Sequence, residues 1–272
     1  MPVKKMTIKH LCSKSLRSFL FSLALVLFSS LQGWSQIDSL FTLANRQYQQ
    51  NEFSLAAKTY QQLTEKGIQT PEIFYNLGNA YFKNGYLGYA VLNYEKAKLL
   101  DPHDDDISQN LAIANARVTD KIDIIPDFFI KRWLYHLINL LPSNTWAIIG
   151  LITFAAMLAL FMLYFFSGNM AIKRFGFYST VALLLISMLA YWCAVKRKKI
   201  VTENIAAIVV EPSVSIKSSP DTEGNNIFVL HEGTKVMIID SIESWKEIRL
   251  TDGNKGWLES KAIQPIQCCN SQ

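Results

Sequence analysis

Cysteine is scarce in this chain of 272 residues, and its four positions exclude two kinds of protein. Cys12 and Cys193 each stand alone, and Cys268 and Cys269 are adjacent near the C-terminus. A structural zinc site needs ligand pairs at short spacings, and a disulfide framework needs several cysteines spread along the chain. We therefore expect neither a zinc protein nor a disulfide-stabilised scaffold.

Surplus charge is also lacking once the N-terminal segment is set aside. Five of the 27 Lys and Arg residues fall within residues 1–35, which carry no acid, so 22 basic residues face 22 acidic ones in the remainder. Nucleic-acid binding requires an excess of Lys and Arg over a coherent surface. The sequence therefore predicts no nucleic-acid partner.

Groups arranged for catalysis are not evident either. His103, His136 and His231 are isolated in the sequence, without a nucleophile or a metal-ligand spacing around them. We expect a protein that is not an enzyme and that carries no cofactor or metal.

Apolar residues, by contrast, are abundant: they make up 50% of the chain, and the mean hydropathy is +0.14. Such values direct attention to membrane segments. Residues 1–18 are basic, residues 19–31 are mostly apolar, and Gly33 and Ser35 then supply small side chains before a cleavage point. This order predicts a signal peptide over residues 1–35, with an uncleaved anchor as the alternative. Either one sends the following residues across the membrane.

A period of 34 residues follows the leader. The order of large, small and helix-ending residues in 71–104 is typical of a tetratricopeptide repeat (TPR), and a weaker copy occupies 37–70. Residues 104–119 predict a further helix that covers the open end, so the TPR region spans residues 36–120. The positions that carry the pattern are Phe74, Leu77, Gly78, Tyr81, Gly85, Leu87, Ala90, Tyr94, Ala97 and Pro102, with Ala44, Phe53, Ala56 and Tyr60 as their earlier counterparts.

First helices of such repeats line a concave face that commonly binds peptides. Asn45 and Asn79 occupy one repeat position, and Asn76 and Asn110 occupy another. Because an asparagine amide both donates and accepts hydrogen bonds, these residues suit an extended peptide backbone. The alternative is that they are solvent-facing polar residues beside packing aromatics. The candidate partner-binding residues are Asn45, Tyr48, Tyr75, Asn76, Asn79, Phe82, Lys83 and Asn110.

Two uncharged stretches of 21 residues, 146–166 and 175–195, predict a transmembrane hairpin over residues 146–195 with a short connection between its helices. Residues 121–145 join the repeat to this hairpin. Their apolar side chains recur at helical spacing, which predicts a helix lying in the membrane interface, or alternatively one that packs on the repeat.

The charges that flank the hairpin oppose the orientation that the leader predicts. An exported repeat and two spans place the C-terminal region outside with the repeat, yet the basic linker 196–204 begins with four cationic residues on that same side. Positive charges favour the inside of a membrane. We give priority to the leader, because it starts translocation first, and lipid phosphates are then the expected contacts of these bases.

Beyond the linker the pattern changes to short strands separated by turn residues. Residues 205–266 resemble a bacterial SH3-like domain, most specifically at the Gly256-Trp257-Leu258 ending, and a polar tail occupies 267–272. Trp245 and Trp257 are candidates to line a binding groove, with a place in the core as the alternative. The expected strands cover 205–210, 214–217, 227–230, 235–239, 245–250 and 256–258.

The order of these parts resembles the BatE proteins of the Bacteroides aerotolerance (Bat) system, with Asn76-Leu77-Gly78-Asn79-Ala80-Tyr81 and the Gly-Trp-Leu ending as the shared motifs. The expected fold is a multidomain membrane protein with an α-helical TPR solenoid, a two-helix transmembrane hairpin and a small all-β SH3-like barrel. The resemblance implies an inner-membrane subunit that works with von Willebrand A-type membrane proteins and a MoxR-type ATPase in aerotolerance.

Three functional hypotheses follow. The first is a non-enzymatic scaffold in the bacterial inner membrane, with a periplasmic repeat and barrel that recruit envelope proteins. The second is a module whose barrel binds or senses cell-wall (peptidoglycan) peptides. The third is an envelope thiol oxidoreductase, which requires Cys268 or Cys269 to be a nucleophile of low pKa.

Overall fold

The computed structural model describes residues 38–122 and 128–267, and it divides into two compact units, residues 1–68 and 69–272. The predicted signal peptide and the Cys268-Cys269 pair lie outside the described residues. In the first unit, residues 38–49 are helical and precede helix α2 (Phe53–Glu65). Asn51 makes the turn between them at a φ of 63°, a conformation that asparagine tolerates better than most residues.

Three helices open the second unit: α3 (Pro71–Lys83), α4 (Leu87–Leu100) and α5 (Asp105–Arg117). The Thr70 hydroxyl caps α3, and the Asp104 carboxylate caps α5, each accepting a hydrogen bond from a backbone N–H of the first turn. Gly85 turns the chain between α3 and α4 at a φ of +85°, and α4 ends before Pro102, as the repeat pattern predicted.

Close approach of α3 and α4 depends on Gly78. A Cβ atom at this position would lie 2.8 Å from two ring carbons of Tyr94, which is itself only 2% exposed. The aromatic ring therefore occupies the space that any larger residue would need. This contact explains why the repeat pattern pairs a glycine in the first helix with a large residue in the second.

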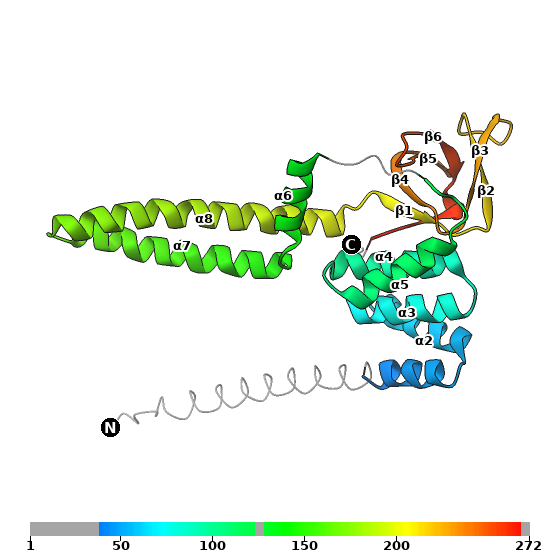
Figure 1. The fold of residues 1–272 in the computed structure, drawn as a ribbon, viewed down its shortest axis with the longest axis horizontal. Helices are drawn as coiled ribbons and strands as arrows, with labels where there is room; N and C mark the ends of the chain where they lie inside the picture. Colours follow the sequence, from blue (N-terminus) through cyan, green and yellow to red (C-terminus); the bar gives the residue numbers. More distant parts are fainter. Residues whose placement is uncertain (1–37, 123–127, 268–272) are drawn as a thin grey trace, which may run out of the picture. The chain divides into compact units, whose positions relative to one another are not determined.

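Two long apolar helices follow, α7 (Ser143–Phe166) and α8 (Met170–Thr202), which run side by side (Figure 1). Both are long and apolar enough to cross a membrane, by length and composition. Gly150 lies at their contact, where the Ser187 hydroxyl donates to its carbonyl oxygen at 3.0 Å. Small side chains at such a position allow the two backbones to approach closely.

Both ends of α8 differ from the sequence-based expectation. The connection before it comprises residues 167–169 alone, because Asn169 caps the helix by accepting a hydrogen bond from Ala171 N. Residues 196–202, expected to belong to a linker, continue the helix. Lysine and arginine are good helix formers, so the basic cluster marks a change in polarity and not the end of the helix.

Arg197 within this cluster is buried, with 3% exposure, and its Nη2 donates to the carbonyl oxygens of Leu99 (2.8 Å) and Leu100 (3.2 Å). These carbonyls belong to the last turn of α4, where a cation is favoured by the helix dipole. The expectation that all four bases contact lipid phosphates is therefore wrong for Arg197.

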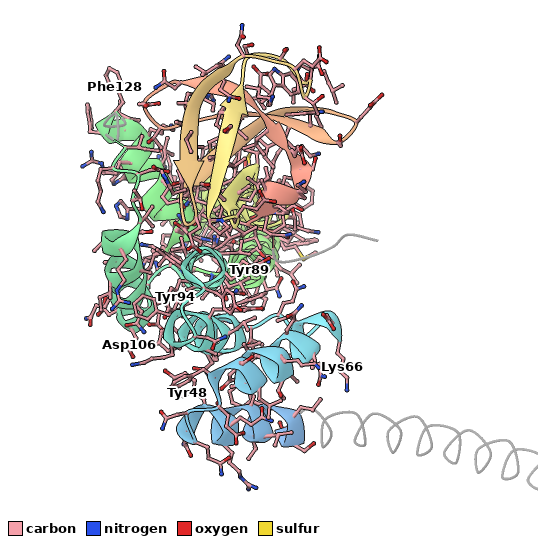
Figure 2. All side chains as sticks on the ribbon, turned by 90° about the vertical axis from the view of Figure 1, so that its right-hand side faces the viewer. Tyr48, Lys66, Tyr89, Tyr94, Asp106 and Phe128 are labelled. Atoms are coloured by element: carbon pink, nitrogen blue, oxygen red, sulfur yellow. The ribbon has the colours of Figure 1, made fainter. Side chains whose placement is uncertain are left out.

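Helix α6 (Phe129–Asn139) lies between the repeat and the hairpin and packs against α8. Its N-terminal apolar side chains are exposed, including Phe129 and Trp133, and Phe128 directly before it is 81% exposed and projects outward (Figure 2). Its C-terminal end is buried at Ile138 and Asn139. The apolar residues thus serve two surfaces, one in contact with α8 and one unpartnered within the described structure.

A seven-stranded antiparallel sheet, in the order β3-β2-β6-β5-β4-β1-β7, forms the C-terminal region. Its inner face carries a buried core to which Ile216, Ile248 and Leu258 contribute. The elements are β1 (Ala206–Val209), β2 (Ser213–Lys217), β3 (Asn226–His231), β4 (Lys235–Ile242), β5 (Trp245–Arg249), β6 (Lys255–Glu259), the 3₁₀-helix η1 (Ser260–Ala262) and β7 (Ile263–Pro265). Strand β7 was not expected from the sequence.

Strand β1 is buried on both faces. Ala207 and Val209 belong to the core of the sheet, whereas Ala206 and Ile208 pack on α4 and α5 in a second core. Because side chains alternate along a strand, one strand can serve two cores only if both of its faces are apolar. The repeat helices and the sheet of the second unit therefore share a hydrophobic core (Figure 1).

Polar contacts reinforce this shared core. Gly88 N, in the first turn of α4, donates to the Glu232 carboxylate at 2.9 Å, and Lys235 Nζ lies 2.7 Å from Glu95 Oε2. A Cβ atom on Gly88 would lie 2.9 Å from the Val209 carbonyl oxygen. The start of α4 therefore lies directly against the backbone at the end of β1.

Candidate functional site

Asparagines at equivalent repeat positions make equivalent hydrogen bonds. In the second unit the Tyr94 hydroxyl donates to Asn79 Oδ1 at 2.7 Å, and in the first unit Tyr60 donates to Asn45 Oδ1. Both bonds join the first helix of a repeat to its second helix, 15 residues later. The 34-residue period is thus a period in hydrogen bonding as well as in side-chain size. Asn45 and Asn79 are part of the internal structure of each repeat.

A polar cluster assembles around Asn79 from three helices; it comprises Tyr75, Asn79, Tyr94 and Asn110. Asn110 Nδ2, on α5, donates to Asn79 Oδ1 and to the Tyr75 hydroxyl, each at 2.9 Å. Both Asn79 and Asn110 are half-buried. Asn79 Nδ2 and Asn110 Oδ1 make no hydrogen bond to any residue in the described ranges. One donor and one acceptor therefore stay available, which is the pair that an extended peptide backbone uses.

The remaining predicted residues of the second unit flank this cluster. The Arg117 guanidinium lies 4.4 Å from the centre of the Phe82 ring, in a cation–π contact that stabilises both side chains. Lys83 is exposed at the end of α3, and Asn76 is half-buried. Arg117 was missed by the sequence analysis, although its place one period from Lys83 gave a usable signal.

Tyr48 and Asn45 belong to the first unit. Tyr48 packs edge-to-face on Phe53, with the ring centres 5.2 Å apart. Burial, with a smaller contribution from the nearby Tyr48, raises the pKa of Tyr60 to about 12. The Tyr60 hydroxyl therefore stays protonated and remains a donor to Asn45 at any physiological pH.

Trp245 and Trp257 lie on the neighbouring strands β5 and β6. Trp245 pairs with Glu259, and Trp257 pairs with Glu247. Because opposite residues share a face and side chains alternate, both tryptophans project from the same side of the sheet. The intervening Ile248 is fully buried on the other side, whereas both tryptophans are half-buried. The structure places them outside the buried core of the sheet.

The Asp120 carboxylate makes three polar contacts with the sheet, and the sequence did not predict them. Its Oδ2 accepts hydrogen bonds from His231 N (2.7 Å) and from the Thr234 hydroxyl (2.6 Å), and its Oδ1 lies 2.8 Å from His231 Nδ1. Burial acts to raise the pKa of Asp120, but hydrogen bonds from Thr234 and His231 outweigh it and hold the pKa below its ordinary value. His231 is thus a structural partner, and no local signal connects residues 111 positions apart.

Within residues 38–122 and 128–267, no group of three or more His, Cys, Asp or Glu side chains is placed to hold a metal ion. The polar groups described above are engaged in hydrogen bonds between helices or between the repeat and the sheet.

Comparison with known families places one module in this chain. A family model described as TPR repeat matches residues 44–85, which include the second half of the first helix, all of α2 and all of α3. A comparison with curated proteins finds no match. The chain therefore contains a tetratricopeptide repeat, a helical module that generally mediates protein–protein interaction.

Proposed function

We propose that this protein is a non-enzymatic scaffold of the bacterial inner membrane that recruits envelope proteins through its repeat. The TPR repeat and the half-satisfied Asn79–Asn110 pair support this function, because together they offer a donor and an acceptor on a helical interaction module. The proposed partners are von Willebrand A-type Bat proteins and, through them, a MoxR-type ATPase. The resemblance to BatE proteins suggests a Bat complex linked to aerotolerance.

The proposed organisation follows the sequence-based boundaries: a signal peptide (1–35), the TPR region (36–120), an interfacial segment (121–145), the hairpin (146–195), a basic segment (196–204), an SH3-like barrel (205–266) and a tail (267–272). The antiparallel sheet at 206–265 supports the barrel assignment. The alternative of a thiol oxidoreductase stays a hypothesis, because Cys268 and Cys269 lie outside the described residues.

The shared core bears on topology. Ala206 and Ile208 of the sheet pack against the repeat helices, so both must lie on one side of a membrane. Two spans between them satisfy this requirement, and a leader would make that side the periplasm. The basic cluster at residues 196–199 also opposes this orientation less strongly than its sequence indicates, because Arg197 forms hydrogen bonds with the end of α4. We therefore propose a periplasmic repeat and sheet.

Affinity purification from crosslinked membranes tests the scaffold proposal. The variant Asn76→Ala/Lys83→Ala removes two candidate peptide contacts, and neither side chain makes a hydrogen bond within the described structure. The variant Tyr94→Phe removes the internal hydrogen bond to Asn79 and leaves Asn76 and Lys83 in place. We expect the first variant to lose membrane partners that the wild type and Tyr94→Phe retain.

The double variant Asn45→Ala/Asn79→Ala extends this test to both repeat positions. Partners retained by both the Asn76→Ala/Lys83→Ala and the Asn45→Ala/Asn79→Ala proteins would contradict recruitment through the concave face. Loss of partners in Tyr94→Phe alone would show that recruitment depends on the internal Tyr94–Asn79 bond and not on contacts through Asn76 and Lys83.

Cell-wall binding is a second candidate, favoured by the two tryptophans on one outward face of the sheet. Aromatic side chains on a sheet surface suit sugar–peptide ligands through stacking and apolar contact. The full chain in detergent would be sedimented with purified sacculi, with Trp245→Ala/Trp257→Ala as the variant and Ile227→Ala, another exposed apolar residue of the sheet, as the control. Equal sedimentation of all three proteins would contradict this candidate.

A further inference from the structure

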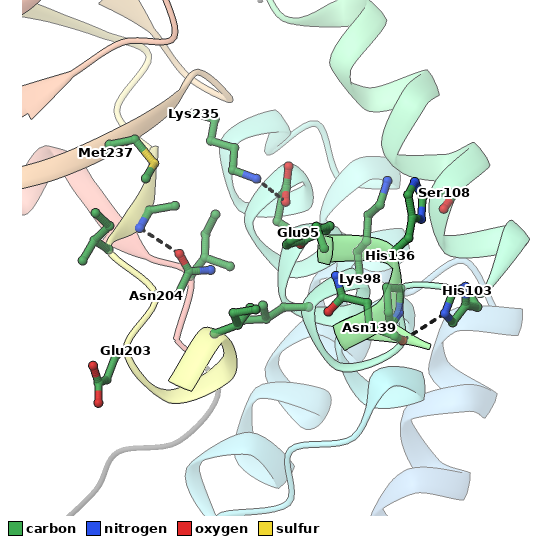
Figure 3. Close-up of a pocket in the computed structure, with 17 residues that line it drawn as sticks. Glu95, Lys98, His103, Ser108, His136, Asn139, Glu203, Asn204, Lys235 and Met237 are labelled. Carbon is green, nitrogen blue, oxygen red and sulfur yellow. Dashed lines mark hydrogen bonds and ion pairs between the residues drawn. The ribbon is translucent and has the colours of Figure 1, made fainter. Parts of the chain in front are cut away.

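A cavity of about 860 Å³ lies in the second unit where α4, α6, the end of α8 and strands β1 and β4 meet (Figure 3). It is separate from the polar cluster around Asn79, and none of the predicted partner-binding residues lines it. Polar and apolar side chains both contribute to its wall. They include Lys98, Ser108, His136, Asn139, Met237 and Ile266.

Asn139 is the unusual member of this wall. Asn139 is only 4% exposed. Both polar atoms of its side chain, Oδ1 and Nδ2, are buried without a hydrogen-bond partner in the described structure. Its backbone oxygen, by contrast, accepts a hydrogen bond from His103 Nε2 at 3.0 Å. In Figure 3 the amide points toward the space between Lys98 and the end of α8. A buried amide without partners is costly, so this position favours a polar ligand.

The charges around the cavity favour an anion. Glu95 is neutralised by Lys235 at 2.7 Å, and Glu203 at the rim pairs with Lys199 at 3.1 Å. Lys98 has no such partner among the described residues, so its ammonium group is the unbalanced charge. The Ser108 hydroxyl, the His136 ring and the Asn139 amide supply further donors. Several donors beside one ammonium group match the oxygens of a phosphate.

The apolar part of the wall and its position indicate the rest of the ligand. Met237 and Ile266 line one side. Helix α6, which forms another side, begins with the exposed Phe129 and Trp133, and α8 leads from the cavity into the hydrophobic hairpin. Aromatic residues of this kind favour the interface between a membrane and water. Anionic lipid head groups occupy this same interface.

We propose that this cavity binds the phosphate of an anionic ligand, with Lys98 as the charge partner and Asn139 as a hydrogen-bonding partner. The phosphate belongs either to a phospholipid head group or to a soluble phosphate ester. The lipid source rests on the membrane anchoring in the proposed function, whereas the phosphate chemistry does not.

Native mass spectrometry of the full chain in detergent tests this site. The probes are phosphatidylglycerol, phosphatidylcholine and glycerol phosphate. The variants are Lys98→Gln and Asn139→Leu, and the control is Lys255→Gln, which makes the same charge change on the exposed start of β6. We expect one tightly retained phosphatidylglycerol, held about tenfold more weakly by Lys98→Gln, because a hydrogen bond to a charged group is lost.

Each outcome decides the proposal. Preference for phosphatidylglycerol that is lost in Lys98→Gln but kept in Lys255→Gln supports it, and competition by glycerol phosphate identifies the soluble source. Equal retention of both lipids by all variants would indicate nonspecific lipid around the hairpin and overturn it. Lys98→Gln decides the case if Asn139→Leu fails to fold, because Lys98 has no ion pair whose loss would disturb the structure.

Carbonate extraction of membranes separates this inference from the proposed function. A chain that resists extraction but binds no phosphate-bearing probe overturns the cavity assignment alone. A chain that is extracted yet binds glycerol phosphate overturns the anchoring and leaves the anion site in place.

Discussion

Replacing Asp120 by alanine should loosen the repeat from the sheet. The carboxylate accepts two hydrogen bonds from His231 and one from Thr234, and it connects the segment after α5 to the turn between β3 and β4. The Thr234 residue is 2% exposed, so its hydroxyl would lose its acceptor in a place that water reaches poorly. The substitution thus weakens the contact between the repeat helices and the sheet, which share a hydrophobic core.

The expected magnitude follows from those three bonds. A hydrogen bond to a charged group contributes about 1.5–3 kcal/mol, and contributions within one network do not add. The His231 side chain is 39% exposed, so solvent replaces part of what it loses. We expect local opening to become easier by about 3 kcal/mol, which is about a hundredfold in an exchange rate. Asp120→Asn keeps an acceptor and should show an increase of about tenfold.

Amide hydrogen exchange of the full chain in detergent measures this effect. Exchange should accelerate in peptides covering 228–236 and 112–120, and it should stay unchanged within α7. Asp221→Ala is the matched control, because that carboxylate accepts hydrogen bonds only inside its own exposed turn. Unchanged exchange at the boundary in Asp120→Ala would refute the role assigned to this carboxylate.

Three further perturbations follow from the same structure. Folding lowers the pKa of Asp120, so the stability that its carboxylate contributes is present above the unfolded pKa of about 4 and is lost as the pH falls through the folded pKa. Amide exchange in peptides 112–120 and 228–236, corrected for its intrinsic pH dependence, should therefore rise in acid. Asp120→Asn should abolish this pH dependence. Gly78→Ala should destabilise the repeat by about 1–3 kcal/mol, since its methyl group meets the Tyr94 ring; thermal unfolding should show a lower midpoint than for Gly168→Ala, whose methyl group meets nothing within 4 Å. Arg197→Gln should cost about 1–3 kcal/mol at the end of α4, and slow exchange preserved there would contradict its capping role.

Local signals in the sequence predicted the helical repeat and the two apolar helices. The repeat is encoded by short-range spacing: Gly78 admits a neighbouring helix, Gly85 allows the turn and Pro102 stops the second helix. Hydropathy likewise depends only on residues adjacent in the chain. The family match at residues 44–85 confirms the repeat, and the helices at 143–166 and 170–202 have the length and composition expected of spans.

The ends of these elements were harder to predict because competing local signals have different physical meanings. The basic residues after position 195 indicate where an apolar stretch ends, but they are also strong helix formers, and α8 continues to Thr202. For the same reason Lys173 and Arg174 lie inside a helix and not in a loop. The charged residues showed which segments are polar, but they did not show whether those segments are helical.

The sequence by itself determined the modules: a TPR repeat, two apolar helices long enough to cross a membrane, and a region of short strands. Tertiary structure alone decided how they meet within the second unit. Strand β1 is buried on both faces because it serves two cores, Arg197 caps a helix 97 residues earlier in the chain, and Asp120 joins a turn 111 residues later. Such pairings depend on complementary charge and shape between segments far apart in the chain, and neither composition nor periodicity records which distant partner each side chain contacts.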